Sequence, residues 1–233
     1  MPAKEALILV PGLLCDDALW QYQLTALREF ADPVVADVTG ASSIAELARR
    51  VLDSAPPRFA LAGLSMGGYV SFEIWRQAPE RVTRLALLDT SARADTDETR
   101  ARRQDLIELA QRGRFKGVTP RLLPLLVHPR HLGGPIAAVA TEMAERVGQA
   151  AFVRQEMAIM GRIDSRPTLP TISVPSLVLC GEDDQLTPPD LAREMAAGIP
   201  AAELEIVSDC GHLSTLERPE AVNRALIGWL AAG

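Results

Sequence analysis

The chain has 233 residues, of which 48% are hydrophobic and 23% are charged, and its formal net charge is −6. This length and composition are sufficient for one compact domain with a sizeable core and an insertion. An acidic chain without a basic tail is a poor partner for phosphate backbones, so we expect no nucleic-acid binding. No apolar run approaches the roughly 18 residues that cross a bilayer, so we also expect no membrane span.

Short apolar runs alternate with helix-compatible segments along most of the chain. Strands are predicted at residues 7–10, 34–38, 59–62, 85–88, 177–179 and 204–207. Helices are predicted at residues 43–52, 66–77, 190–197 and 219–230. Because parallel strands are joined by crossovers, the alternation predicts an α/β fold. We expect a mostly parallel sheet of about six or more strands, flanked by helices on both faces.

The third predicted strand runs into Gly63-Leu64-Ser65-Met66-Gly67, a G-x-S-x-G pattern at a strand-to-helix turn. Such a turn strains the serine backbone, and glycines are needed where the strand and the helix crowd together. The pattern also occurs in ordinary turns, and a serine hydroxyl is a weak nucleophile without a base. Ser65 is therefore a candidate nucleophile whose partners must come from elsewhere in the chain.

Two later segments supply candidate partners. His212 follows the sixth predicted strand, whereas the other two histidines, His128 and His131, lie in the middle of the chain. An acidic loop with Asp183 and Asp184 follows the fifth predicted strand. The simpler interpretations are a loop histidine bonded to backbone and an acidic helix cap. A serine, an acid and a histidine in this order would also fit a catalytic triad, in which the acid orients the base.

These motifs together resemble the α/β-hydrolase fold superfamily, in which nucleophile, acid and histidine follow successive strands in that order. The resemblance covers residues 7–89 and 174–229. In most members of the family the acid stands three residues after the glycine that ends its strand, which selects Asp184 over Asp183. Asp89, after the fourth predicted strand, remains a rival because some relatives place their acid there. The resemblance thus implies the triad Ser65, Asp184 and His212.

The same resemblance implies an oxyanion hole formed by the backbone N–H groups of Leu13 and Met66. This chain has Pro11-Gly12 where the commoner family pattern has His-Gly, which leaves the loop geometry open. The implied reaction is hydrolysis of a small-molecule carboxylic ester or thioester through an acyl-enzyme, with no metal or organic cofactor. A lyase, a cofactor-free perhydrolase and a small-molecule receptor remain alternatives, because relatives use the same pocket for these functions.

Residues 91–170 lack clear strands and contain helix-like runs at 102–111 and 139–147. By resemblance this region is a helical lid over a core formed by residues 1–90 and 171–233, and it shapes the acyl pocket. It holds 13 Lys and Arg against 9 Asp and Glu, a net charge of +4, and the remainder has −10. A basic lid could attract substrates with a carboxylate or phosphate, including coenzyme A thioesters, although solvated helix faces are the simpler interpretation.

The three cysteines, Cys15, Cys180 and Cys210, are too few and too widely spaced for a disulfide framework or a close-spaced metal site. A reducing cytoplasm therefore fits best. We expect the three thiols to fill small apolar spaces near the catalytic face. A cysteine nucleophile paired with His212 is the less favoured alternative. The sequence does not indicate an oligomeric state.

Overall fold

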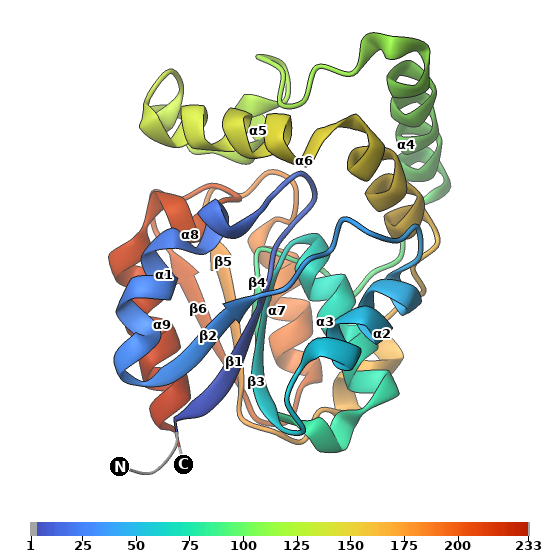
Figure 1. Ribbon diagram of the computed structural model, residues 1–233. Helices are drawn as coiled ribbons and strands as arrows, with labels where there is room; N and C mark the ends of the chain where they lie inside the picture. Colours follow the sequence, from blue (N-terminus) through green and yellow to red (C-terminus); the bar gives the residue numbers. More distant parts are fainter. Residues whose placement is uncertain (1–3, 233) are drawn as a thin grey trace.

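The computed structural model describes residues 4–232, and its strands form one sheet of six parallel strands (Figure 1). The strand order across the sheet is β2-β1-β3-β4-β5-β6. The strands are β1 Glu5–Val10, β2 Ala31–Val35, β3 Phe59–Leu64, β4 Val82–Leu88, β5 Ser176–Gly181 and β6 Ala202–Val207. The predicted fold class is confirmed, with every neighbouring pair of strands parallel.

Helices cover both faces of the sheet (Figure 1). Helices α2 (Ile44–Ser54), α3 (Met66–Gln77) and α7 (Pro189–Gly198) join one cluster of buried apolar side chains. Helices α1 (Gln21–Ala26) and α9 (Pro219–Ala231) join a second cluster on the other face. The four helices predicted in this part of the chain are all present, with ends that differ by a few residues.

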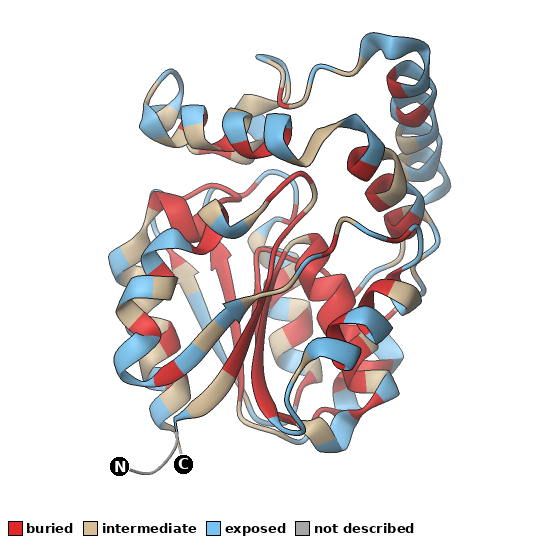
Figure 2. Cartoon of the chain, viewed as in Figure 1, coloured by how far each residue is buried: buried red, intermediate tan, exposed pale blue. Residues whose placement is uncertain are grey.

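Alternation along β1 assigns its side chains to the two clusters. Leu7 and Leu9 belong to the cluster under α1 and α9, whereas Ile8 and Val10 belong to the cluster under α2 and α3. This is the two-residue period of a strand that is covered on both faces. The central strands are accordingly buried over most of their length (Figure 2).

The second strand differs from its prediction. β2 spans Ala31–Val35 rather than residues 34–38, and it includes Pro33. Proline interrupts a strand in the middle of a sheet because it has no N–H to donate, but β2 is an edge strand and bonds only to β1. The segment from η1 (Asp17–Trp20) to α1 was also absent from the prediction.

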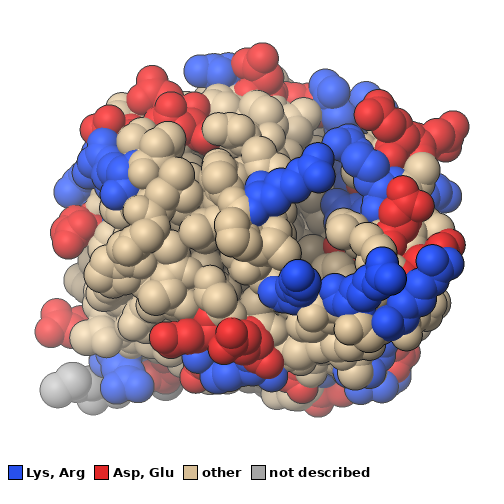
Figure 3. Space-filling view, turned by 90° about the horizontal axis from the view of Figure 1, so that it is seen from above, with Lys and Arg blue, Asp and Glu red and all other residues tan. Residues whose placement is uncertain are grey.

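The chain between β4 and β5 forms a helical insertion above the carboxyl ends of the strands (Figure 1). Its main helix, α6 (Pro135–Met160), is interrupted at Gly148, where φ is +76°. The predicted helical runs lie within α4 and η4, and within α6. The other elements are α4 Asp97–Leu109, η4 Ala110–Arg114, α5 Leu123–Leu126, η5 Pro129–His131 and η6 Arg166–Thr171. Seen from above, this face has a hollow with Lys and Arg side chains at its border (Figure 3).

After the insertion the chain returns to β5, and α8 (Ser214–Glu217) follows β6. None of the helices within residues 4–232 combines the length and the apolar character that crossing a membrane requires.

Candidate active site

Ser65 stands at a sharp turn between β3 and α3, with φ +55° and ψ −116°. Two glycines make this turn sterically feasible. A Cβ on Gly63 would lie 2.3 Å from the Gly67 carbonyl oxygen, and a Cβ on Gly67 would lie 2.0 Å from the Val10 carbonyl oxygen. The Ser65 N–H donates to the carbonyl oxygen of Leu88 at 3.0 Å. Backbone packing therefore fixes the strained serine. Ser65 is partly exposed just beyond the carboxyl end of β3.

The structure brings Ser65, His212 and Asp184 together. The Nε2 atom of His212 lies 2.9 Å from Ser65 Oγ, and its Nδ1 atom lies 2.8 Å from Asp184 Oδ2. The two ring nitrogens thus contact the serine and the carboxylate at once, a geometry in which a carboxylate can orient an imidazole toward a hydroxyl. His212 and Asp184 are buried.

The Asp184 carboxylate is anchored by its own loop. Its Oδ1 atom accepts hydrogen bonds from the Leu186 N–H at 2.8 Å and the Thr187 N–H at 3.0 Å, and its Oδ2 atom accepts from the Thr187 hydroxyl at 2.6 Å. Burial raises the pKa of Asp184, but the charge of His212 and the hydrogen bonds outweigh burial and hold that pKa below its usual range. Burial lowers the pKa of His212, but Asp184 outweighs it and the pKa lies above the ordinary value. Both shifts favour an ion pair.

The two other candidate acids occupy different places. Asp183 is exposed, and its Oδ2 lies 3.6 Å from His128 Nε2. Asp89 is fully buried but makes no hydrogen bond with His212: it accepts hydrogen bonds from the Gly181 N–H at 2.9 Å and from the Ser214 hydroxyl. Burial, followed by the charge of Asp184, raises the pKa of Asp89 to about 8. Of the three acids, Asp184 is therefore the one whose carboxylate lies within hydrogen-bond distance of the His212 ring.

The turn after β1 lies directly beside the serine. A Cβ on Gly12 would be 3.3 Å from the Ser65 Cβ. The Leu13 N–H makes no hydrogen bond within the described residues. Met66 is the first residue of α3, a position where the N–H has no acceptor within the helix. Both predicted oxyanion donors thus belong to backbone segments adjoining Ser65.

Sequence reasoning missed Gln155 of α6, which holds this turn. Its Oε1 atom accepts a hydrogen bond from the Leu14 N–H at 3.1 Å, and its Nε2 atom donates to the Val38 carbonyl oxygen at 3.2 Å. Leu14 has φ +59°, so the turn is strained as well as tied. No local pattern singles out a glutamine within a long helix, and the side chain is fully buried.

Sequence reasoning also missed Glu217 of α8, a buried carboxylate below the His212 loop. Its Oε1 atom accepts from the Leu213 N–H at 3.1 Å, and its Oε2 atom accepts from the Gly211 N–H at 3.1 Å and the His128 N–H at 2.8 Å. Glu217 therefore holds the residues on both sides of His212 and joins them to the insertion. The one signal in the sequence is the position of this acid, five residues after the histidine.

The insertion packs an apolar cluster against the turn after β1. The cluster comprises Leu14, Ala110, Val118, Ala144 and Phe152, and partly buried side chains, including Leu13 and Phe115, pack against it. Apolar side chains from the insertion therefore meet the turn that adjoins the serine.

The three cysteines are all buried. Burial raises the pKa of Cys15 to about 12 and raises the pKa of Cys180 and Cys210 further, so none is a reactive thiolate near neutral pH. The Sγ of Cys180 lies near carboxylate oxygens of Asp89 and Asp184. A protonated thiol is a poor metal ligand, and both carboxylates already accept hydrogen bonds, so this group is ill suited to hold an ion.

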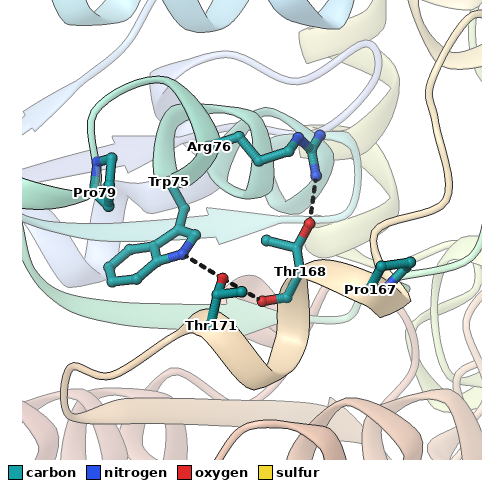
Figure 4. A pocket seen from close by; sticks show the side chains of 6 residues that line it. All are labelled: Trp75, Arg76, Pro79, Pro167, Thr168 and Thr171. Carbon is teal, nitrogen blue, oxygen red and sulfur yellow. Dashed lines mark hydrogen bonds between the residues drawn. The ribbon is translucent and has the colours of Figure 1, made fainter.

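A surface pocket of about 360 Å³ lies at the other end of α3 (Figure 4). Within it the Trp75 indole N–H donates to the Thr171 hydroxyl at 3.0 Å, and the Arg76 guanidinium donates to the Thr168 hydroxyl at 3.2 Å. About ten residues of helix, roughly 15 Å at 1.5 Å per residue, separate it from Ser65. Its polar groups bond to each other, and it is not part of the site at Ser65.

Comparisons with known proteins agree with this fold. Residues 7–225 match the Alpha/beta hydrolase family. A RutD protein of Azorhizobium caulinodans, whose name refers to carbamate hydrolysis, is 30% identical over 97% of this chain and 91% of its own length. A pimeloyl-[acyl-carrier protein] methyl ester esterase of Photobacterium profundum is 28% identical over 92% of this chain and 90% of its own. The structure of a thermophilic esterase from Thermogutta terrifontis is similar with a TM-score of 0.89 and 27% identity, over 98% of this chain and 90% of that one.

Proposed function

Because this chain belongs to the α/β hydrolase family, we propose that it is a serine hydrolase that cleaves a small-molecule carboxylic ester or thioester through an acyl-enzyme. The observation that carries the proposal is the continuous series of contacts from Ser65 Oγ through the His212 ring to Asp184. The names of two similar proteins, a methyl ester esterase and a thermophilic esterase, support the ester class.

In the first half of the proposed reaction, His212 Nε2 accepts the proton of the Ser65 hydroxyl while Oγ attacks the substrate carbonyl carbon. The bond from that carbon to the alcohol or thiol then breaks, and His212 returns the proton to the leaving group. In the second half, His212 accepts a proton from water, and the water oxygen attacks the acyl carbon. The acid is released, and Ser65 regains the proton from His212.

Two backbone donors are assigned to the oxyanion of the tetrahedral intermediates. The N–H groups of Leu13 and Met66 adjoin Ser65 from two different segments, and two such donors stabilise negative charge that develops on the carbonyl oxygen. Asp184 steadies the positive charge that His212 acquires in each half-reaction, because the two groups are buried at hydrogen-bond distance.

We assign residues 91–170 the role of a lid over a core of residues 1–90 and 171–233. The support is the apolar cluster that α6 and the segment around Phe115 form with Leu13 and Leu14. An acyl chain bonded to Ser65 would have to run beside these side chains, so the insertion would set acyl preference.

The experiment measures hydrolysis of p-nitrophenyl butyrate by the wild-type protein and by Ser65→Ala. The variant should lose turnover by a factor on the order of 10⁶, because the nucleophile acts as a unit with its base. Ser54→Ala, at an exposed helix position, is the matched control and should retain wild-type turnover. Near-normal turnover by the Ser65 variant would contradict the proposal.

Labelling with a fluorophosphonate, followed by mass spectrometry of the Ser65 peptide, tests activation of the hydroxyl separately from turnover. Labelling without product from any ester or thioester would redirect the assignment toward a receptor or a non-hydrolytic relative. Product analysis with peracid and carbon–carbon substrates would then distinguish those alternatives.

A further inference from the structure

One stretch of the insertion has no carboxylates. Residues 109–141 contain neither Asp nor Glu, whereas they contain five cations, Arg112, Arg114, Lys116, Arg121 and Arg130. The net charge of +4 in residues 91–170 is therefore concentrated in this stretch. Exposed helices usually carry positive and negative side chains side by side. We therefore asked where the cations of residues 109–141 lie relative to the site.

Two of the five cations are neutralised by ion pairs. Arg130 lies 2.7 Å from Asp209, and Arg112 lies 3.4 Å from Glu108. The remaining three are exposed and form no ion pair within residues 4–232. We call these three the cationic rim, which consists of Arg114, Lys116 and Arg121.

The cationic rim borders the apolar cluster described above. Phe115, between Arg114 and Lys116, packs against this cluster, and its ring centroid lies 5.2 Å from that of Phe152. Leu13, next to the turn residue Gly12 that adjoins Ser65, packs against the same cluster. Apolar contacts thus connect the rim to the turn beside the serine.

The view from above shows a hollow in the same face, with Lys and Arg side chains at its border (Figure 3). A substrate that enters through this face passes Lys and Arg side chains before it reaches the apolar side chains. A group of exposed cations without neighbouring carboxylates raises the local concentration of anions and increases their association rate. Added salt screens this effect.

We propose that the cationic rim selects substrates with an anionic group, a carboxylate or a phosphate, on the part that lies outside the apolar cluster. This inference rests on the proposed ester or thioester hydrolysis. The anion can be a carboxylate at the far end of the acyl chain or the phosphates of a coenzyme A leaving group. Both sources offer oxygen anions that Arg and Lys bind by charge-assisted hydrogen bonds.

The test compares two matched substrate pairs. Mono-p-nitrophenyl adipate against p-nitrophenyl hexanoate examines charge on the acyl side, and butyryl-coenzyme A against butyryl-N-acetylcysteamine examines charge on the leaving group. The variant R114Q/K116Q/R121Q should lower kcat/KM for the anionic member of at least one pair about tenfold, chiefly through KM. The neutral members should keep their wild-type values, and 0.5 M NaCl should reduce the wild-type preference.

The control variant R28Q/R58Q/R224Q removes the same number of charges from exposed positions of the core that form no ion pair within the described residues. It should leave the ratio of anionic to neutral kcat/KM unchanged. The inference is overturned if the rim variant keeps the wild-type ratio for both pairs, or if the control lowers the ratio as much as the rim variant does. If the wild-type protein hydrolyses none of the four substrates, the proposed function itself is overturned.

Discussion

The nucleophile side and the histidine side of the candidate site are fixed by different means. On the nucleophile side, backbone geometry holds Ser65: its φ is +55°, and the Thr90 hydroxyl donates to its carbonyl oxygen at 2.7 Å. On the histidine side, two buried carboxylates hold the His212 loop, Asp184 through the ring and Glu217 through the flanking N–H groups. The first side should therefore be sensitive to added volume, and the second should be sensitive to lost charge.

The largest effect should follow from removal of the imidazole itself. His212→Ala should lower turnover by a factor on the order of 10⁶, because the serine then has no base. The backbone turn at Ser65 should survive, since none of its hydrogen bonds involves the imidazole. Ester turnover and circular dichroism check the two halves of this expectation.

His128→Ala provides the matched control, because the His128 ring lies near the exposed Asp183 rather than near the serine. It should retain turnover within a few-fold of the wild type. Comparable losses in both variants would contradict the assignment of His212 as the base.

The next effect compares the two buried aspartates. Asp184→Asn should lower turnover by about 10⁴, because an amide can neither orient the required tautomer nor stabilise the imidazolium. Asp89→Asn should cost less than about tenfold, because Asp89 makes no hydrogen bond with His212 and its carboxylate instead accepts from Gly181 and Ser214. Steady-state rates at pH 7 measure both, and the opposite ranking would transfer the role of the acid to Asp89.

The difference between the two sides also explains what could be predicted from the sequence. The nucleophile side was accessible because its requirements are contiguous: Gly63, Ser65 and Gly67 form one pattern, and steric crowding demands the glycines. The roles of the glutamate and glutamine side chains were not accessible. The Glu217 bond to the His128 N–H spans 89 residues, and the Gln155 bond to the Leu14 N–H spans 141.

The same reasoning applies to the fold. Buried strands such as β3 and β5 were predicted because apolar runs between turns have a direct physical cause in two-faced burial. The prediction for the edge strand β2 was displaced: the strand runs from Ala31 to Val35 and includes Pro33, and only Ala31 of its five residues is buried, so it lacks the continuous apolar run of a central strand. The assignment of residues 91–170 as a lid remains a prediction.

A smaller effect is expected at Glu217, which we interpret as a positioning residue. Glu217→Gln should lower kcat about tenfold, because an amide group would face an N–H that now donates to a carboxylate. The charge of Glu217 contributes to the raised pKa of His212. His212 must be deprotonated to act as a base, so loss of that charge should move the acidic limb of kcat/KM to lower pH.

Glu220→Gln removes a charge from an exposed position on α9 and should leave both kcat and the pH profile unchanged. If the acidic limb of kcat/KM is not shifted in Glu217→Gln, Glu217 supports the His212 loop structurally but does not influence the pKa of the histidine.

The smallest effect concerns the nucleophile side, where a side chain assists the backbone. Gln155→Leu would leave the Leu14 N–H and the Val38 carbonyl without their partner, at a cost of about 1–3 kcal/mol for each buried group. If the turn positions the Leu13 N–H for the oxyanion, kcat should fall a few-fold while KM stays unchanged, because the donor acts in the transition state. Gln149→Leu, at an exposed position of α6, is the matched control.

Gln155→Glu separates stability from catalysis. A carboxylate still accepts from the Leu14 N–H but cannot donate to the Val38 carbonyl when ionised, so the side chain keeps its bond to the turn and loses its bond to Val38. We expect kcat closer to the wild type in Gln155→Glu than in Gln155→Leu, even where both melt at lower temperature. Equal kcat values in the two variants would mean that the oxyanion turn is held by its own backbone, as Ser65 is, and that the insertion contributes only stability.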